Sequence, residues 1–132
     1  MTLPLQPHPR PPDPAAAVVL FAHGSRDPLW RAPIDAVAAR MAQIDPQRPV
    51  RCAFLELCSP DLPTCVDQLV DEGRQSIQVL PLFLGVGRHA REDLPRIVDA
   101  LIQRHPGVRF TLRRAMGEEP ALIDLMARLA LD

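Results

Sequence analysis

Residues 18–28 read Val-Val-Leu-Phe-Ala-His-Gly-Ser-Arg-Asp-Pro, a short apolar run that ends abruptly in polar residues. The run is rich in β-branched and large apolar side chains and stops at a turn signal, so it predicts a buried strand. Residues 79–89 have the same design, with an apolar run followed by glycines, Arg88 and His89. Open α/β sheets bind ligands at the carboxyl ends of their strands. The two segments therefore predict neighbouring strands that share one site.

The rest of the chain alternates predicted strands with predicted helices. Apolar runs predict strands over residues 16–22, 50–55, 76–84 and 108–112, and helical spacing predicts helices over about 29–44, 62–72, 91–104 and 120–131. Four β-α units with short links predict an α/β fold, an open parallel four-stranded sheet in the order 2-1-3-4 with helices on both faces. Residues 1–15 are rich in proline and are expected to form a flexible tail, which leaves 16–132 as a single domain.

Composition narrows the class of protein and of partner. With 132 residues and a formal net charge of −1, the chain is expected to bind neither nucleic acid nor a membrane surface. It has no signal-peptide pattern and no run of about 20 apolar residues, so we expect a cytoplasmic protein. The cysteines are expected to be reduced, with Cys52 and Cys65 in the core and Cys58 just beyond a strand end.

Three side chains that can bind a metal follow three of the predicted strands: His23, Glu56 and His89. Two imidazoles and a carboxylate form a nitrogen and oxygen donor set that suits divalent cobalt, iron, nickel or zinc. A single histidine after a strand is more often only a hydrogen-bonding loop residue, and Glu56 has an alternative interpretation as a helix cap. Two histidines at equivalent strand ends favour the functional interpretation.

The remaining two histidines are left out of this candidate site. His8 belongs to the Pro-rich segment and is expected to be inert. His105 precedes Pro106 and Gly107, where a predicted helix ends. A histidine there is explained by favourable contact with the carboxyl end of the helix.

Glycines and arginines gather at the same predicted edge. Gly24, Gly85 and Gly87 permit backbone conformations closed to other residues and let a ligand approach closely. Guanidinium groups can bind carboxylates through paired hydrogen bonds, although solvated loop charge and compositional bias are simpler explanations of an arginine-rich chain. The arginines concerned are Arg26, Arg88 and Arg91.

These motifs resemble those of the class II chelatases. His23-Gly24-Ser25-Arg26 follows the first predicted strand, and Pro81-Leu82-Phe83-Leu84-x-x-Gly87-x-His89, with Asp93-x-Pro95 beyond it, follows the third. From about residue 18 to 129 the chain is similar to the short CbiX-like sirohydrochlorin chelatases, which are related to SirB-type siroheme ferrochelatases. The Pro-rich segment and Cys58 are not part of the family pattern, and Cys58 leaves open a softer metal site.

The resemblance implies a chelatase-like fold and a metal-inserting enzyme. It implies insertion of a divalent metal, cobalt first and iron next, into a carboxylate-rich tetrapyrrole, sirohydrochlorin, toward cobalamin or siroheme. By motif match, His23 and His89 are metal ligands and proton acceptors, and Glu56 is their acidic partner. The residues expected to bind the macrocycle are Ser25, Arg26, Gly87, Arg88 and Arg91. Metal and tetrapyrrole are both substrates, so no permanent cofactor is expected, and short members are expected to be homodimers.

Two other functions fit part of the pattern. A metal or tetrapyrrole carrier without catalytic activity would use the same ligands. A phosphoryl-transfer enzyme with a histidine nucleophile is a further hypothesis, since a histidine and a glycine follow the first strand. Its usual arginine before the histidine is absent, because that position is Ala22.

Overall fold

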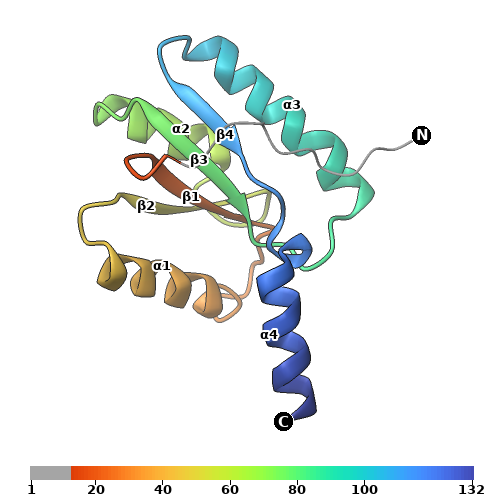
Figure 1. Cartoon of the computed structure of the whole chain (residues 1–132). Helices are drawn as coiled ribbons and strands as arrows, with labels where there is room; N and C mark the ends of the chain where they lie inside the picture. Colours follow the sequence, from red (N-terminus) through yellow and green to blue (C-terminus); the bar gives the residue numbers. More distant parts are fainter. Residues whose placement is uncertain (1–12) are drawn as a thin grey trace.

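The computed structural model describes residues 13–132 and confirms the alternation of strands and helices (Figure 1). A short 3-10 helix, η1, which the sequence did not predict, precedes the last helix. In chain order the elements are β1 (Ala17–Ala22), α1 (Ala32–Ile44), β2 (Val50–Phe54), α2 (Leu62–Asp71), β3 (Ser76–Pro81), α3 (Arg88–Arg104), β4 (Arg109–Leu112), η1 (Met116–Glu118) and α4 (Pro120–Leu131).

The strands form one parallel sheet in the order β2-β1-β3-β4, which confirms the predicted topology. β1 lies inside the sheet, and all six of its residues are buried. Its Leu20 pairs with Cys52 of β2 on one side and with Leu80 of β3 on the other. The order reverses between β1 and β3, so the loops after β1, β2 and β3 meet at the carboxyl edge of the sheet.

The two faces of the sheet are covered unequally. On one face, Val19 and Phe21 of β1 join the buried residues of α2 and α3 in the main core. On the other face, Ile34 of α1 packs with Phe54 and Ala22. Helix α4 has no buried residue, and Figure 1 shows it extending away from the sheet. The apolar face expected of this helix is therefore largely uncovered in a single chain.

Strand β3 is shorter than predicted. It ends at Pro81 instead of residue 84, where its partner β1 also ends and where proline offers no N–H to the ladder. Leu82 still donates its N–H to the carbonyl oxygen of Phe21 (2.8 Å). The chain then turns toward η1, and the N–H of Gly117 donates to the carbonyl oxygen of Phe83 (2.8 Å). The apolar residues beyond Pro81 therefore line the carboxyl edge.

Two helices begin at other residues than expected. Helix α1 begins at Ala32 instead of about residue 29. Helix α3 begins at Arg88 instead of about residue 91, with Gly87 in extended conformation as its N-cap. His89 therefore lies in the first turn of a helix and not in a loop, which fixes its backbone more firmly.

Asp13 lies inside the segment expected to be a tail, and it packs against the domain. Its carbonyl oxygen accepts hydrogen bonds from Arg48 Nη2 (2.9 Å) and Gln78 Nε2 (3.2 Å), and its carboxylate pairs with Arg109 (3.3 Å). The hydroxyl of Ser76 and the N–H of Ala15 lower the pKa of this carboxyl group. The rest of the predicted tail, with His8, lies outside the described residues.

The cysteines are free thiols. Cys65 is buried in the core, as expected, and its burial raises the pKa of the thiol to about 11. Cys52 and Cys58 are partly buried on the α1 side of the sheet. None of the helices within residues 13–132 is long and apolar enough to cross a membrane.

Candidate metal site

The loops after β1 and β2 are joined through their backbones. Leu55 donates its N–H to the carbonyl oxygen of Ala22 (2.9 Å), and Glu56 donates to that of His23 (3.0 Å). Gly24 has a φ of +97°, and a Cβ at this position would lie 1.7 Å from the carbonyl oxygen of Glu56. Only glycine permits this close approach, so the sequence His-Gly holds His23 beside the Glu56 loop.

His23 is exposed and lies against an aromatic ring. The centroids of the His23 imidazole and the Phe83 ring are 4.4 Å apart, with the planes tilted by 31°. Phe83 itself is buried, and its ring also contacts Phe21 edge-on at 5.9 Å. The imidazole is therefore supported from the core while it stays accessible from solvent, and Phe83 connects the loop after β3 to the loop after β1.

Glu56 lies on a tight loop that presents its side chain to solvent. Cys58 donates its N–H to the carbonyl oxygen of Glu56 (2.9 Å), and Leu57 between them has a φ of 68°. A positive φ costs free energy in a branched residue and is maintained only where the surroundings enforce it. The strained loop keeps Glu56 exposed beside the backbone of His23.

His89 is exposed and has a carboxylate partner. Its Nε2 lies 2.8 Å from Oδ2 of Asp93, one helical turn further along α3. A carboxylate bound to one ring nitrogen orients the imidazole and leaves the other nitrogen for a metal or a proton. Asp93 is not among the predicted site residues, although the i, i+4 spacing of His89 and Asp93 is visible in the sequence.

The three predicted ligands do not form a closed set in this structure. Within residues 13–132, no group of three or more His, Cys, Asp and Glu side chains is arranged to hold a metal ion. The backbones of His23 and Glu56 are adjacent, whereas His89 stands on α3. The structure thus joins two of the ligand-bearing loops directly and leaves the third on a separate element.

The predicted macrocycle-binding residues have different local roles. The Ser25 hydroxyl accepts a hydrogen bond from the N–H of Asp27 (3.0 Å), which stabilises the first loop. Arg88 pairs with Glu92 (3.1 Å) at the exposed start of α3. Arg91 donates to the carbonyl oxygen of Val86 (2.7 Å) and so closes its own loop. Arg26 is exposed, and Gly87 caps α3.

Two further arginines, which were not among the predicted site residues, lie at this edge. Arg113 and Arg114 follow β4 directly and are both exposed. Their signal in the sequence is a pair of charged residues at the end of the fourth predicted strand. His105, left out of the site, pairs through Nε2 with Asp67 of α2 (2.9 Å). That contact joins α2 to α3 and explains the residue without a role in catalysis.

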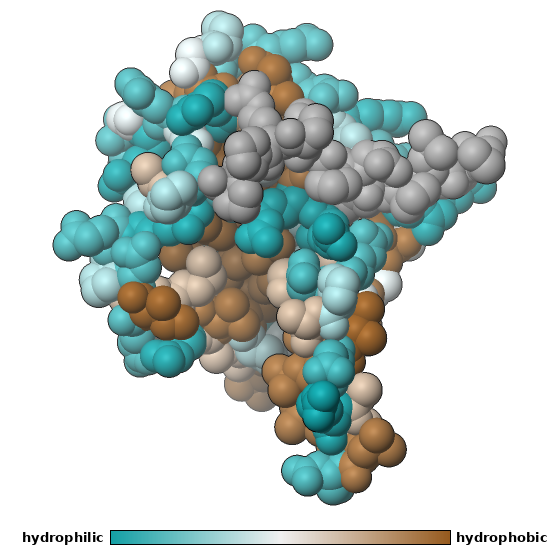
Figure 2. All heavy atoms as spheres, viewed as in Figure 1, coloured by the Kyte–Doolittle hydropathy of each residue, from teal (hydrophilic) through white to brown (hydrophobic). Residues whose placement is uncertain are grey.

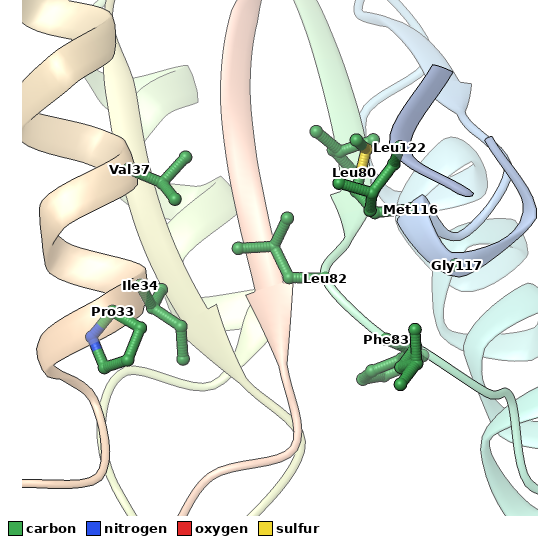
Figure 3. Close-up of a pocket in the computed structure, with 10 residues that line it drawn as sticks. Pro33, Ile34, Val37, Leu80, Leu82, Phe83, Met116, Gly117 and Leu122 are labelled. Atoms are coloured by element: carbon green, nitrogen blue, oxygen red, sulfur yellow. The ribbon is translucent and has the colours of Figure 1, made fainter. Parts of the chain in front are cut away.

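An apolar pocket of about 390 Å³ adjoins the site. Figure 3 shows Val37 of α1 on one side, Met116 and Leu122 on the other, and Leu82 between them. Phe83, which supports His23, also lines this pocket. Through Phe83, the His23 imidazole is thus connected to an apolar space.

Comparison with known proteins places the chain in a family. The CbiX family matches residues 17–132. The sirohydrochlorin cobaltochelatase of Methanopyrus kandleri is 34% identical over 82 residues, which are 62% of this chain and 57% of that protein. The enzyme of the same name from Methanococcus maripaludis is 24% identical over 135 residues, with 83% of this chain and 94% of that protein covered. The match thus spans less than two thirds of the Methanopyrus relative.

Solved structures show the same fold. A putative cobalamin biosynthesis CbiX protein from Marinobacter aquaeolei superposes with a TM-score of 0.76 at 30% identity, covering 87% of this chain and 93% of that one. SirB from Bacillus subtilis subspecies spizizenii, in complex with cobalt, gives a TM-score of 0.66 at 27% identity, and the match covers 86% of this chain but 48% of SirB. The fold, the motifs at its carboxyl edge and the match over residues 17–132 agree: the chain belongs to the CbiX family.

Proposed function

We propose that this protein is a sirohydrochlorin chelatase that inserts a divalent metal, cobalt in first place and iron in second, into the tetrapyrrole. The observation that carries the proposal is the pair of exposed imidazoles at the carboxyl edge, each supported by a neighbour. His23 rests on Phe83, and His89 is held by Asp93. Relatives named sirohydrochlorin cobaltochelatase and ferrochelatase support it.

The chemistry of insertion needs open and accessible ligands. The metal is a substrate that must lose water, be bound briefly and pass to the ring nitrogens. Imidazole nitrogens and a carboxylate oxygen suit such borderline ions, and exposed ligands leave coordination positions free for the macrocycle. Two pyrrole protons must also leave, and an imidazole hydrogen-bonded to a carboxylate, as His89 is to Asp93, can accept a proton. We assign His23, Glu56 and His89 to metal binding and catalysis.

The macrocycle is proposed to bind over the same edge. Its carboxylates are suited to the guanidinium groups of Arg26, Arg88 and Arg91, together with Ser25 and the Gly87 turn. Arg113 and Arg114 extend this set, because they follow the neighbouring strand at the same edge. We expect the protein to need no permanently bound cofactor.

We also propose that residues 16–132 act as one domain, that two copies pair as a homodimer and that the protein is cytoplasmic. The pairing is supported by the exposed apolar side chains of α4, among them Leu125 and Leu129.

The direct test is metal insertion by the purified protein. Sirohydrochlorin is mixed with Co²⁺ or Fe²⁺, and the absorbance change of the ring is followed. We expect His23→Ala, His89→Ala and Glu56→Gln to slow insertion by at least about tenfold, which is the lower range for loss of a metal ligand or its partner. His8→Ala is the matched control for the histidine variants, because His8 is expected to be inert. Glu72→Gln is the control for Glu56→Gln, because Glu72 pairs with Arg51 on the surface, away from the proposed ligands.

Three outcomes would contradict parts of the proposal. Insertion by the histidine variants at the wild-type rate places the site elsewhere. Tight binding of sirohydrochlorin or cobalt without insertion above the uncatalysed rate identifies a carrier. A covalent phosphohistidine at His23 points to phosphoryl transfer.

A further inference from the structure

Helix α4 has the composition of a buried helix but no buried residue. All of its residues except Asp124 and Arg128 are apolar, and these two pair with each other at 2.8 Å, one turn apart. The polar surface of the helix is therefore a single stripe. A helix that is apolar on all its other sides is typical of a core position. Its exposed large side chains are Ile123, Leu125, Leu129 and Leu131, between 49% and 89% exposed.

The same chain leaves an apolar groove open on the α1 face of its sheet. Helix α1 packs on β1 and β2, so it covers only that half of the face. Beside it, Leu80 of β3 and Leu82 form the floor of the 390 Å³ pocket, and Val37 of α1 forms one wall. In Figure 2 hydrophobic residues surround a hollow between the body of the protein and α4. A second helix ordinarily fills this place in a sheet covered on both faces.

The helix of the same copy touches only the rim of this groove. Leu122, in its first turn, and Met116 of η1 line the wall opposite α1. The position of η1 is fixed by the hydrogen bond from Gly117 to Phe83 and by a close backbone approach, since a Cβ on Gly117 would lie 1.6 Å from the carbonyl oxygen of Leu84. From this anchored start α4 extends away from the sheet, so Leu125 and Leu129 remain in solvent.

We propose that two copies of this chain exchange their last helices, so that α4 of each copy lies in the groove beside α1 of the other. The length of α4 matches that of the helix beside which it would lie. The 12 residues of α4 extend about 18 Å, and the 13 residues of α1 extend about 20 Å. Groove and helix belong to the same chain, so a single twofold operation fills both grooves at once. The inference rests on the proposed pairing of two copies, but not on metal insertion.

Exchange would connect the pairing of two copies to the candidate site. Phe83 lines the groove, and its ring supports the His23 imidazole at 4.4 Å. A helix from the second copy would therefore pack on the residue that positions a proposed ligand. It would also remove from water most of the large apolar surface that α4 exposes in a single copy.

The first experiment measures molar mass by size-exclusion chromatography with light scattering. We expect the full chain to be a dimer and the double variant Leu125→Asp/Leu129→Asp to be a monomer, because two carboxylates would enter the apolar groove. The matched control is Asp124→Asn/Arg128→Gln, which changes the polar stripe of the same helix and is expected to stay dimeric. Circular dichroism verifies that each variant is folded. A dimer that survives the Leu125 and Leu129 changes overturns the exchange.

The second experiment locates the contact by a disulfide between copies. Val37→Cys on α1 and Leu125→Cys on α4 are combined in one chain and oxidised mildly. We expect a covalent dimer from the double variant and none from either single variant or from the natural sequence. A covalent dimer from Leu125→Cys alone shows that the two α4 helices contact each other and overturns occupation of the groove.

The outcomes separate this inference from the proposed function. A chain that is monomeric at every concentration contradicts both pairing and exchange, whether or not it inserts cobalt. If Val37→Asp remains dimeric but no longer binds sirohydrochlorin, the groove holds the macrocycle and not a helix, and the exchange is wrong. Failure of metal insertion in an exchanged dimer would contradict only the proposed function.

Discussion

At the scale of single residues, the site depends most directly on Gly24. Its φ is +97°, and an added Cβ would meet the carbonyl oxygen of Glu56 at 1.7 Å. We expect Gly24→Ala to lower the free energy of unfolding by about 1–3 kcal/mol and to separate the His23 loop from the Glu56 loop. Urea denaturation and the rate of cobalt insertion measure the two effects. Gly107→Ala is the control, because nothing lies within 4 Å of a Cβ there and the residue precedes β4, away from the candidate site. Equal losses for the two variants would refute the contact explanation.

Asp93 is expected to act as a positioning residue for His89. Its carboxylate lies 2.8 Å from the imidazole, and loss of such a partner typically lowers metal affinity or activity by about 10- to 100-fold. We expect Asp93→Asn to raise the cobalt concentration needed for half-maximal insertion and Asp93→Glu to restore part of it. Asp99→Asn, an exposed change on the same helix, is the control. An unchanged cobalt dependence in Asp93→Asn would show that the contact is only structural.

At the scale of elements, the start of α2 illustrates how a local pattern fixes a boundary. The Asp61 carboxylate accepts a hydrogen bond from the N–H of Thr64 (2.8 Å) as the N-cap of the helix. We expect Asp61→Ala to lower the free energy of unfolding by about 1 kcal/mol. Asp71→Ala at the other end of α2 is the control, since a carboxylate there faces the negative end of the helix dipole and its loss is expected to be neutral or stabilising.

The contribution of Asp61 is also expected to depend on pH in a defined direction. Hydrogen bonds from the Thr64 hydroxyl and N–H lower the pKa of Asp61 in the folded state. The stabilisation is therefore complete above the unfolded pKa of about 3.9 and is lost as pH falls through the lower folded value. Urea denaturation of wild type and Asp61→Ala should give converging stabilities below about pH 4. A constant difference across that range would contradict the assignment.

The elements that the sequence predicted well are those with local signals. Asp61 and Gly73 mark both ends of α2, and the apolar run of β1 marks a strand covered on both faces. The end of β3 has only a weak local signal, Pro81, because Leu82 and Phe83 continue the apolar run beyond it. Strand β3 ends where its pairing with β1 ends, and this pairing belongs to the tertiary structure. For the same reason the periodicity of α4 predicted an apolar face but not which copy of the chain covers it.

At the scale of the whole molecule, the order of the strands could be predicted from the sequence. The contact that supports the His23 imidazole could not. Strand ends placed His23 and Glu56 at one edge, and the sheet order makes their loops adjacent. The ring of Phe83 beneath His23 depends on how the loop after β3 turns toward η1. Contacts between segments far apart in the sequence set that turn, so the local sequence pattern does not predict it.

At the scale of the whole molecule, we expect some residues to stabilise the fold of a single chain and others to stabilise only the dimer. Phe21 is fully buried at the sheet centre, and Phe21→Ala is expected to cost about 3–5 kcal/mol at every protein concentration. Leu129 is 63% exposed in a single copy, so Leu129→Ala should cost little in a monomer. In an exchanged dimer Leu129 becomes buried, and its loss lowers the Tm only where dimers form. Thermal unfolding over a wide range of protein concentration distinguishes these two contributions. We expect the difference in Tm between wild type and Leu129→Ala to grow with protein concentration. A difference that stays constant would assign Leu129 to the fold of the single chain.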